Sequence, residues 1–181
     1  MDVQKASIVF SADQVRRMLG ELAQALHKRH PDPRDLALVG IRTGGAFLAY
    51  RLRELLAVLW GQAPDTGVMD ITLYRDDWTR LHSRPRVGRT EMDFAIDDRV
   101  VVLVDDVIYT GRTTRAALDA LIDFGRPRRI ELLALIDRGQ RELPIQADYV
   151  GAQLIPQSGR VIDVMLTEEG SPEDAVVSRP I

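Results

Sequence analysis

The chain has 181 residues, of which 45% are hydrophobic and 28% charged, and its formal net charge is −3. This length allows an α/β domain with a substantial core, and the net charge argues against binding of nucleic acid by overall positive charge. Because there is no cysteine, disulfides, thiolate catalysis and cysteine-based zinc sites are excluded. No apolar run approaches the roughly 20 residues of a membrane helix and no signal-peptide pattern is present, so we expect a cytoplasmic location and no membrane partner.

Apolar segments alternate with helical patterns along the chain. Ser11 is a suitable N-cap, and the apolar spacing behind it predicts a helix that ends near His30. In chain order we expect a strand at 6–10, this helix, a strand at 36–41, a helix at 46–60, strands at 68–74 and 100–104, a helix that opens at 110–114, and a strand at 130–136. This alternation predicts an α/β fold with a mostly parallel sheet flanked by helices on both faces.

Two parts of the chain lack this alternation. Residues 75–99 are polar, rich in arginine and without clear periodicity, so we expect a functional or mobile loop. From about residue 137 to 181 the chain reads as short β segments, which we expect to form a small hood. No repeat, low-complexity tract or linker is visible, so residues 1–181 are predicted to form a single domain.

Residues 100–114 carry the strongest indication of function. An apolar run ends in two carboxylates, Asp105 and Asp106, which suit sugar hydroxyls or a Mg²⁺ ion. A turn rich in hydroxyl groups and a helix start follow, and unpaired N–H groups there favour phosphate. An ordinary strand–turn–helix is the plain alternative, but the length and order of the pattern favour a site for a phosphorylated sugar. The turn consists of Thr110, Gly111, Arg112, Thr113 and Thr114.

A second glycine-rich turn, Arg42-Thr43-Gly44-Gly45, follows the strand at 36–41. It matches neither a Walker motif nor a dinucleotide fingerprint. A tight turn is the plain interpretation, and a backbone cradle for a diphosphate is the functional one. Ligands of parallel sheets bind beyond the carboxyl ends of the strands, so we expect both turns to lie at one edge of the sheet.

Residues 100–114 resemble the phosphoribosyl pyrophosphate (PRPP) motif of type I phosphoribosyltransferases. The resemblance implies a fold of that type, in which Asp105 and Asp106 bind the ribose hydroxyls with Mg²⁺ nearby. It also implies that residues 110–114 cradle the 5′-phosphate. Purine members usually carry an acid where this chain has Tyr109, which argues against a purine base.

The same resemblance concerns the pyrophosphate. The second turn is similar to the pyrophosphate loop of these enzymes, which implies that Arg42, Thr43 and Gly44 lie against the diphosphate. Arg75 begins the polar loop, whose counterpart closes over the site and carries a basic residue toward pyrophosphate. An exposed ion pair is the plain alternative for Arg75.

The segment Ile-Asp-Arg-Gly-Gln-Arg-Glu-Leu-Pro-Ile at 136–145 narrows the resemblance. Together with Gly-Ile-Arg-Thr-Gly-Gly and Tyr-Arg-Asp-Asp, it resembles the family of pyrimidine operon regulators that double as uracil phosphoribosyltransferases. The reaction implied is uracil + PRPP → UMP + pyrophosphate, with charge stabilisation and positioning as its basis. Uracil is expected to be read by backbone groups of Ile136, Asp137 and Arg138, with Val107 or Tyr109 near the ring.

This family resemblance implies a second role, in which the protein binds the pyr mRNA leader and attenuates expression when UMP or UTP is abundant. Such binding needs basic groups that neutralise phosphates. An ordinary solvated surface is the plain alternative, and Gln140 stands where the family commonly has histidine. A homodimer or homotetramer is also expected from the resemblance. The candidate RNA-binding residues are Arg16, Arg17, His27, Arg138 and Arg141.

Two alternatives stay open. One is a nucleotide-sensing, RNA-binding attenuator with little or no catalytic role, and the complete acidic pair and phosphate turn count against it. The other is a phosphoribosyltransferase for another base. Tyr109 disfavours purines, whereas orotate is excluded by resemblance alone.

Overall fold

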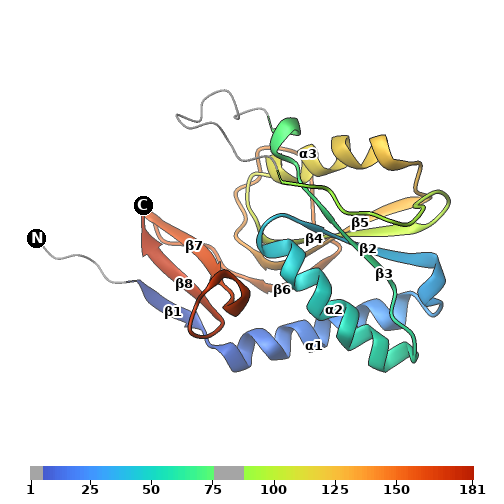
Figure 1. The fold of residues 1–181 in the computed structure, drawn as a ribbon. Coiled ribbons are helices and arrows are strands. Elements are labelled where there is room, and N and C mark those ends of the chain that lie inside the picture. Colours follow the sequence, from blue (N-terminus) through green and yellow to red (C-terminus); the bar gives the residue numbers. More distant parts are fainter. Residues whose placement is uncertain (1–5, 76–87) are drawn as a thin grey trace, which may run out of the picture.

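The computed structural model describes residues 6–75 and 88–181. Its larger sheet is parallel, with the strand order β3-β2-β4-β5-β6, and a smaller antiparallel sheet with the order β1-β8-β7 lies beside it (Figure 1). Among the described residues, no helix combines the length and apolar character needed to cross a membrane. The strands are β1 (Ser7–Phe10), β2 (Leu36–Ile41), β3 (Asp65–Met69), β4 (Val100–Ile108), β5 (Arg129–Asp137), β6 (Tyr149–Gln153), β7 (Arg160–Met165) and β8 (Ala175–Pro180).

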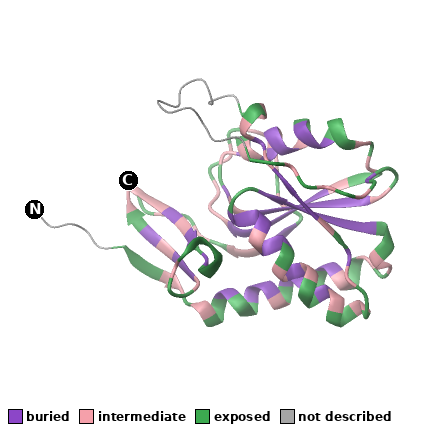
Figure 2. Ribbon diagram, viewed as in Figure 1, coloured by how far each residue is buried: buried purple, intermediate pink, exposed green. Residues whose placement is uncertain are grey.

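Helices cover both faces of the larger sheet, as the alternation predicted. The helices are α1 (Ala12–Arg29), α2 (Gly44–Trp60) and α3 (Arg112–Leu121). Successive residues of a strand point to opposite faces, so Val102 and Val104 of β4 join the core with α1 and α2, whereas Val101 and Leu103 join the core with α3. The central strands are therefore buried on both sides (Figure 2).

Two strand boundaries differ from the prediction. The strand expected at 68–74 spans Asp65–Met69 instead, because the Asp70 carboxylate accepts the N–H of Thr72 (2.7 Å) and turns the chain into a short 3₁₀ helix. The strand expected at 100–104 continues to Ile108, since its backbone pairs with β5 as far as Asp137. The acidic pair therefore lies within β4.

The predicted loop at 75–99 differs from the structure in the part that is described. Residues 76–87 lie outside the described residues. Residues 88–99 pack against the sheet: Glu91 forms a β-bridge with Val68, and Ile96 is fully buried. The sequence did not predict this packing, because the residues that make the contacts follow no regular helix or strand spacing.

The smaller sheet is built from both ends of the chain. β7 and β8 come from the region predicted as the hood, but β1 pairs with β8 and comes from the N-terminal region. β6, which lies within the predicted hood region, joins the larger sheet as a parallel edge strand. Pairing between such distant segments has no local sequence signal.

Candidate active site

The two predicted turns meet at the carboxyl edge of the larger sheet. Adjacent strands β2 and β4 run parallel, so the turn after Ile41 and the acidic pair of β4 emerge on the same side. The polar loop after Asp137 also begins there, because β5 pairs with β4 as far as Ile108. This convergence agrees with the expected ligand position of parallel sheets.

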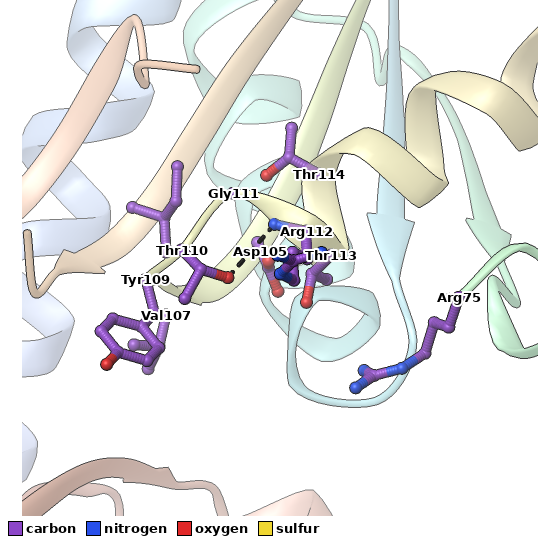
Figure 3. Close-up of a pocket in the computed structure, with 10 residues that line it drawn as sticks. Arg75, Asp105, Val107, Tyr109, Thr110, Gly111, Arg112, Thr113 and Thr114 are labelled. Atoms are coloured by element: carbon purple, nitrogen blue, oxygen red, sulfur yellow. Dashed lines mark hydrogen bonds between the residues drawn. The ribbon is translucent and has the colours of Figure 1, made fainter. Parts of the chain in front are cut away.

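A cavity of about 200 Å³ lies around the turn at 110–114. It is lined by that turn together with Asp105, Val107, Ile108 and Tyr109. Arg75 also lines it and extends toward it from a separate segment (Figure 3). The cavity therefore joins an acidic side chain, an arginine and the start of a helix.

Two of the residues that line this cavity each have a buried side-chain oxygen. Asp105 Oδ2 and Thr114 Oγ1 have no hydrogen-bond partner within residues 6–75 and 88–181, and the two residues are only 5% and 2% exposed. A buried polar atom without a partner costs about 1–3 kcal/mol. A polar ligand that donates to these oxygens would remove that cost.

Local geometry sets the form of the turn. Gly111 has φ 91°, which a residue with a side chain rarely adopts, and α3 begins directly after it. The backbone N–H of Arg112 donates to Thr110 Oγ1 (3.3 Å). The Arg112 side chain pairs with Glu142 (2.8 Å). Arg112 therefore contributes a backbone hydrogen bond within the turn, while its charge is paired with Glu142.

Two glycines bring the second turn against the acidic pair. A Cβ at Gly44 would lie 2.5 Å from Asp106 Oδ2, and a Cβ at Gly45 would lie 3.0 Å from the carbonyl carbon of Val104. The Arg42–Thr43 peptide bond at this corner is cis. Only residues without side chains allow the start of α2 to lie this close to β4.

The two carboxylates differ in their surroundings. As neighbours on a strand they point to opposite faces, so Asp105 lines the first cavity and Asp106 lines a second one. Burial, followed by the charge of Asp106, raises the pKa of Asp105 well above its ordinary value, while Arg75 acts in the opposite direction. A cation close to Asp105 would therefore favour its ionised form.

The second cavity, of about 400 Å³, lies between the two sheets. The predicted residues Thr43, Gly44, Asp106, Val107, Tyr109 and Arg138 line one side of it. The Arg138 guanidinium stacks on the Tyr109 ring at 3.9 Å. The other side comes from residues that sequence reasoning missed: Ile162, Asp163, Val164 and Glu169.

The missed residues carry no local signal, because the smaller sheet brings them to the site only through its pairing. Glu169 is the member of this group whose side chain is influenced by the charge of Asp106. Burial, and then the charge of Asp106, raise the pKa of Glu169 above its ordinary value. The hood therefore presents an acid toward the acidic pair.

The expected uracil contacts at 136–138 are only partly available. Ile136 is fully buried in the core, the carbonyl of Asp137 accepts the N–H of Leu154 (2.8 Å), and the N–H of Arg138 donates to Ile108 (3.0 Å). These two backbone groups of Asp137 and Arg138 are therefore already hydrogen-bonded to neighbouring strands or to the segments that follow them. Within this segment, Arg138 lines the second cavity.

The basic candidates for RNA do not share one exposed face. Arg16 and Arg17 are exposed on α1, whereas the ring of His27 packs against Trp60 with centroids 5.7 Å apart. Arg141 donates to the carbonyls of Tyr109 and Ile145 (both 2.9 Å) and to the Asp137 carboxylate. Its guanidinium therefore connects the backbone next to the turn at 110–114 with the loop that follows β5, a role that its charge alone did not indicate.

Arg42 also points in an unexpected direction. Its Nε donates to the carbonyl of Arg89 (3.2 Å), and its Nη2 pairs with Glu91 (3.0 Å). Arg42 is not among the described residues that line either cavity. It lies at the pyrophosphate-type turn but is connected to the segment that follows residue 87.

Comparisons with known proteins identify the family to which this fold belongs. The phosphoribosyl transferase domain family matches residues 8–168. Among solved structures, the hypoxanthine phosphoribosyltransferase of Trypanosoma cruzi in complex with the product IMP has a TM-score of 0.71 at 19% identity, covering 99% of this chain and 93% of that one. A hypoxanthine phosphoribosyltransferase of Staphylococcus aureus has a TM-score of 0.66 at 19% identity, covering 99% and 94%. At these identities the likeness concerns the fold.

Curated relatives are much closer in sequence. The bifunctional protein PyrR of Syntrophobacter fumaroxidans is 50% identical over 172 residues, which cover 95% of this chain and 92% of that protein. The bifunctional protein PyrR of Desulfosudis oleivorans is 46% identical over 181 residues, covering 99% and 100%. The chain therefore belongs to the PyrR family of bifunctional proteins, within the phosphoribosyl transferases.

Proposed function

We propose that the chain transfers the phosphoribosyl group of PRPP to uracil, forming UMP and pyrophosphate, and that it also regulates pyrimidine genes by binding the pyr mRNA leader. Membership of a family of bifunctional proteins supports both roles. One observation carries the enzymatic role: two residues that line the cavity at the helix-start turn, Asp105 and Thr114, each have a buried oxygen without a hydrogen-bond partner among the described residues. Both proposed partners, PRPP and messenger RNA, occur in the cytoplasm.

PRPP would bind across the acidic pair. The 5′-phosphate would lie in the turn at 110–114, where backbone N–H groups and threonine hydroxyls are available. One ribose hydroxyl would donate to Asp105 and the other to Asp106, where the two cavities share Val107 and Tyr109. The diphosphate would lie toward the turn at 42–44, with Arg75 supplying positive charge from across the cavity.

The residues present fit Mg²⁺. Carboxylate oxygens are hard donors, and Mg²⁺ usually binds one or two of them together with substrate phosphates. Asp105 Oδ2 has no partner among the described residues, so Asp105 and Asp106 are the side chains proposed to hold the ion. When bound, Mg²⁺ would supply positive charge to the departing diphosphate.

The protein would act mainly by position and charge. Bond breaking at the ribose C1 builds positive charge on the sugar, which the carboxylates of Asp105 and Asp106 would stabilise. Arg75 and the backbone N–H groups near Gly44 would stabilise the leaving group. No residue is assigned as a general base.

Uracil would occupy the second cavity, beside Val107 and Tyr109. The backbone groups of Asp137 and Arg138 described above are already paired, so we place recognition at the Arg138 side of the cavity rather than along 136–137. Tyr109 stands in place of an acid that suits purines, which supports a pyrimidine. A phosphoribosyltransferase for orotate is the alternative that a base comparison would reveal.

The test measures UMP formation from uracil and PRPP with and without Mg²⁺. Asp105→Asn should lower kcat/KM by on the order of 10²-fold, while Asp119→Asn, an exposed carboxyl on α3, serves as the matched control and should change it less than about twofold. Orotate and hypoxanthine are offered in parallel. A wild-type protein that binds UMP but forms none would favour the attenuator without catalysis.

The regulatory role would use a surface outside this site. Arg16 and Arg17 are the exposed candidates on α1, and UMP or UTP in the active site would set the affinity for RNA. Charge reversal of both arginines should weaken retention of the pyr mRNA leader. It should also make this retention less dependent on salt concentration, without lowering UMP formation. Asp105→Asn should spare the retention measured without UMP or UTP, and an equal fall in this retention and in UMP formation would contradict separate roles.

Self-association is part of the proposal. α2 exposes several large apolar side chains, namely Tyr50, Leu55, Val58 and Leu59. Such side chains on one helix are typical of surfaces that pair, which supports the homodimer or homotetramer expected from the resemblance. Sedimentation of the purified protein would distinguish these states from a monomer.

A further inference from the structure

Asp70, the first residue after β3, connects the two sides of segment 76–87. Its Oδ1 accepts the N–H of Thr72 (2.7 Å), and its Oδ2 accepts the N–H of Gly88. Its own N–H donates to Thr90 Oγ1 (3.1 Å). One side chain therefore holds the chain where it leaves β3 and where it returns.

The same carboxylate lies close to Arg42. A Cβ at Gly88 would be 2.5 Å from Asp70 Oδ2 and 3.2 Å from Arg42 Cδ, so Gly88 lies between the two side chains. Burial acts to raise the pKa of Asp70, but the hydrogen bonds from Thr72 and Gly88 and the charge of Arg42 outweigh it and lower that pKa. Asp70 is thus a carboxylate at neutral pH.

These contacts lead from Asp70 to Arg75 on one side and, on the other, to Arg42 at the glycine-rich turn. Thr72 starts the short 3₁₀ helix that ends directly before Arg75, and Arg75 lines the first cavity. Gly88 lies against the Arg42 side chain. The Nε of Arg42 donates to the carbonyl of Arg89, the residue after Gly88 (3.2 Å). Asp70 itself is not among the described residues that line either cavity.

We propose that Asp70 is a positioning residue for PRPP: it fixes Arg75 and Arg42 at the pyrophosphate side of the site without contacting the substrate. The inference rests on the proposed function and deepens it. Removing Asp70 would leave the N–H groups of Thr72 and Gly88 without their acceptor. The diphosphate would lose fixed positive charge, whereas the uracil side of the site would keep its walls.

The test compares Asp70→Ala and Asp70→Asn with wild type. Calorimetry measures the Kd of PRPP in the presence of Mg²⁺, and steady-state assays measure KM for PRPP and for uracil. Asp70→Ala should raise the Kd and KM for PRPP about tenfold and leave KM for uracil within about twofold. Asp70→Asn keeps one carbonyl acceptor and should recover part of the loss.

Asp65→Ala is the matched control. Asp65 begins β3, the strand after which Asp70 lies, and it pairs with Arg99 (2.7 Å). It should leave the Kd for PRPP unchanged. Hydrogen exchange at the amides of Thr72 and Gly88 should accelerate in both Asp70 variants and not in the control.

Each outcome decides the proposal. Faster exchange at the two amides with an unchanged Kd for PRPP would overturn it, as would tighter binding of PRPP by both Asp70 variants, which would mean that the charge repels the ligand. If Asp70→Ala does not fold, Asp70→Asn provides the comparison. If wild type binds PRPP but forms no UMP, the proposed reaction fails while the binding comparison still tests Asp70; absence of PRPP binding by wild type overturns both.

Discussion

Two adjacent glycines at the start of α2 should respond very differently to the same substitution. A Cβ at Gly45 would overlap the carbonyl of Val104, which belongs to the backbone of the central strand. A Cβ at Gly44 would meet the carboxylate of Asp106 at 2.5 Å, and that side chain can rotate. Gly45→Ala should therefore push α2 away from β4, whereas Gly44→Ala should displace a proposed catalytic group.

The magnitudes follow from packing and helix propensity. Overpacking a close contact costs roughly 1–3 kcal/mol, and alanine in place of glycine in a helix recovers about 0.5–1 kcal/mol. Gly45→Ala should lower the free energy of unfolding by up to about 2.5 kcal/mol, or up to about 10 °C in Tm for a chain of this size. Gly44→Ala should cost less stability but on the order of 10²-fold in kcat/KM, because a misplaced group cannot act on the sugar.

Gly20→Ala is the control for both variants. Gly20 lies inside α1 and a Cβ there would have nothing within 4 Å, so this change should raise the free energy of unfolding by about 0.5–1 kcal/mol. Circular dichroism records thermal unfolding, and UMP formation records activity. A Gly45→Ala protein as stable as Gly20→Ala, or a fully active Gly44→Ala protein, would refute the close contact of α2 with β4.

Three further outcomes are expected. Burial and the charge of Asp106 raise the pKa of Asp105 in the folded protein. The protonated carboxyl therefore stabilises the fold fully below the unfolded pKa of 3.8, and this stabilisation is lost as the pH rises through the folded pKa. Asp105→Asn should consequently raise the Tm of the ligand-free protein at neutral pH, and the gain in Tm should become smaller in acid. Glu131→Gln should cost about 3 kcal/mol in urea unfolding and leave UMP formation unchanged, since buried Glu131 accepts from Tyr149 (2.7 Å) and pairs with Arg29 (3.1 Å); a cost under about 1 kcal/mol would contradict its role. Arg51→Met removes the pairs (2.5 Å each) that hold the loop carrying Glu169, and should raise KM for uracil several-fold; an equal rise for PRPP would refute that assignment.

Most of the local architecture was predictable from the sequence. The apolar run before Asp105 predicted a strand buried on both faces, and the glycine and threonines after it predicted a helix start. Both predictions are confirmed, because hydrophobic periodicity and turn chemistry act between near neighbours. The parallel arrangement also followed in part, since a helix joins β2 to β3 and β4 to β5, as is usual between parallel strands.

The sequence by itself determined which chemical groups stand at the ends of the parallel strands, and thereby that an acidic pair meets a hydroxyl-rich turn at the start of a helix. Only the tertiary structure decided how Arg141 and Arg42 use their charge, that His27 packs on Trp60, and that Glu169 faces the acidic pair. The physical reason is range: propensity and periodicity concern residues a few positions apart, whereas these side chains meet partners that only the packing of both sheets brings near.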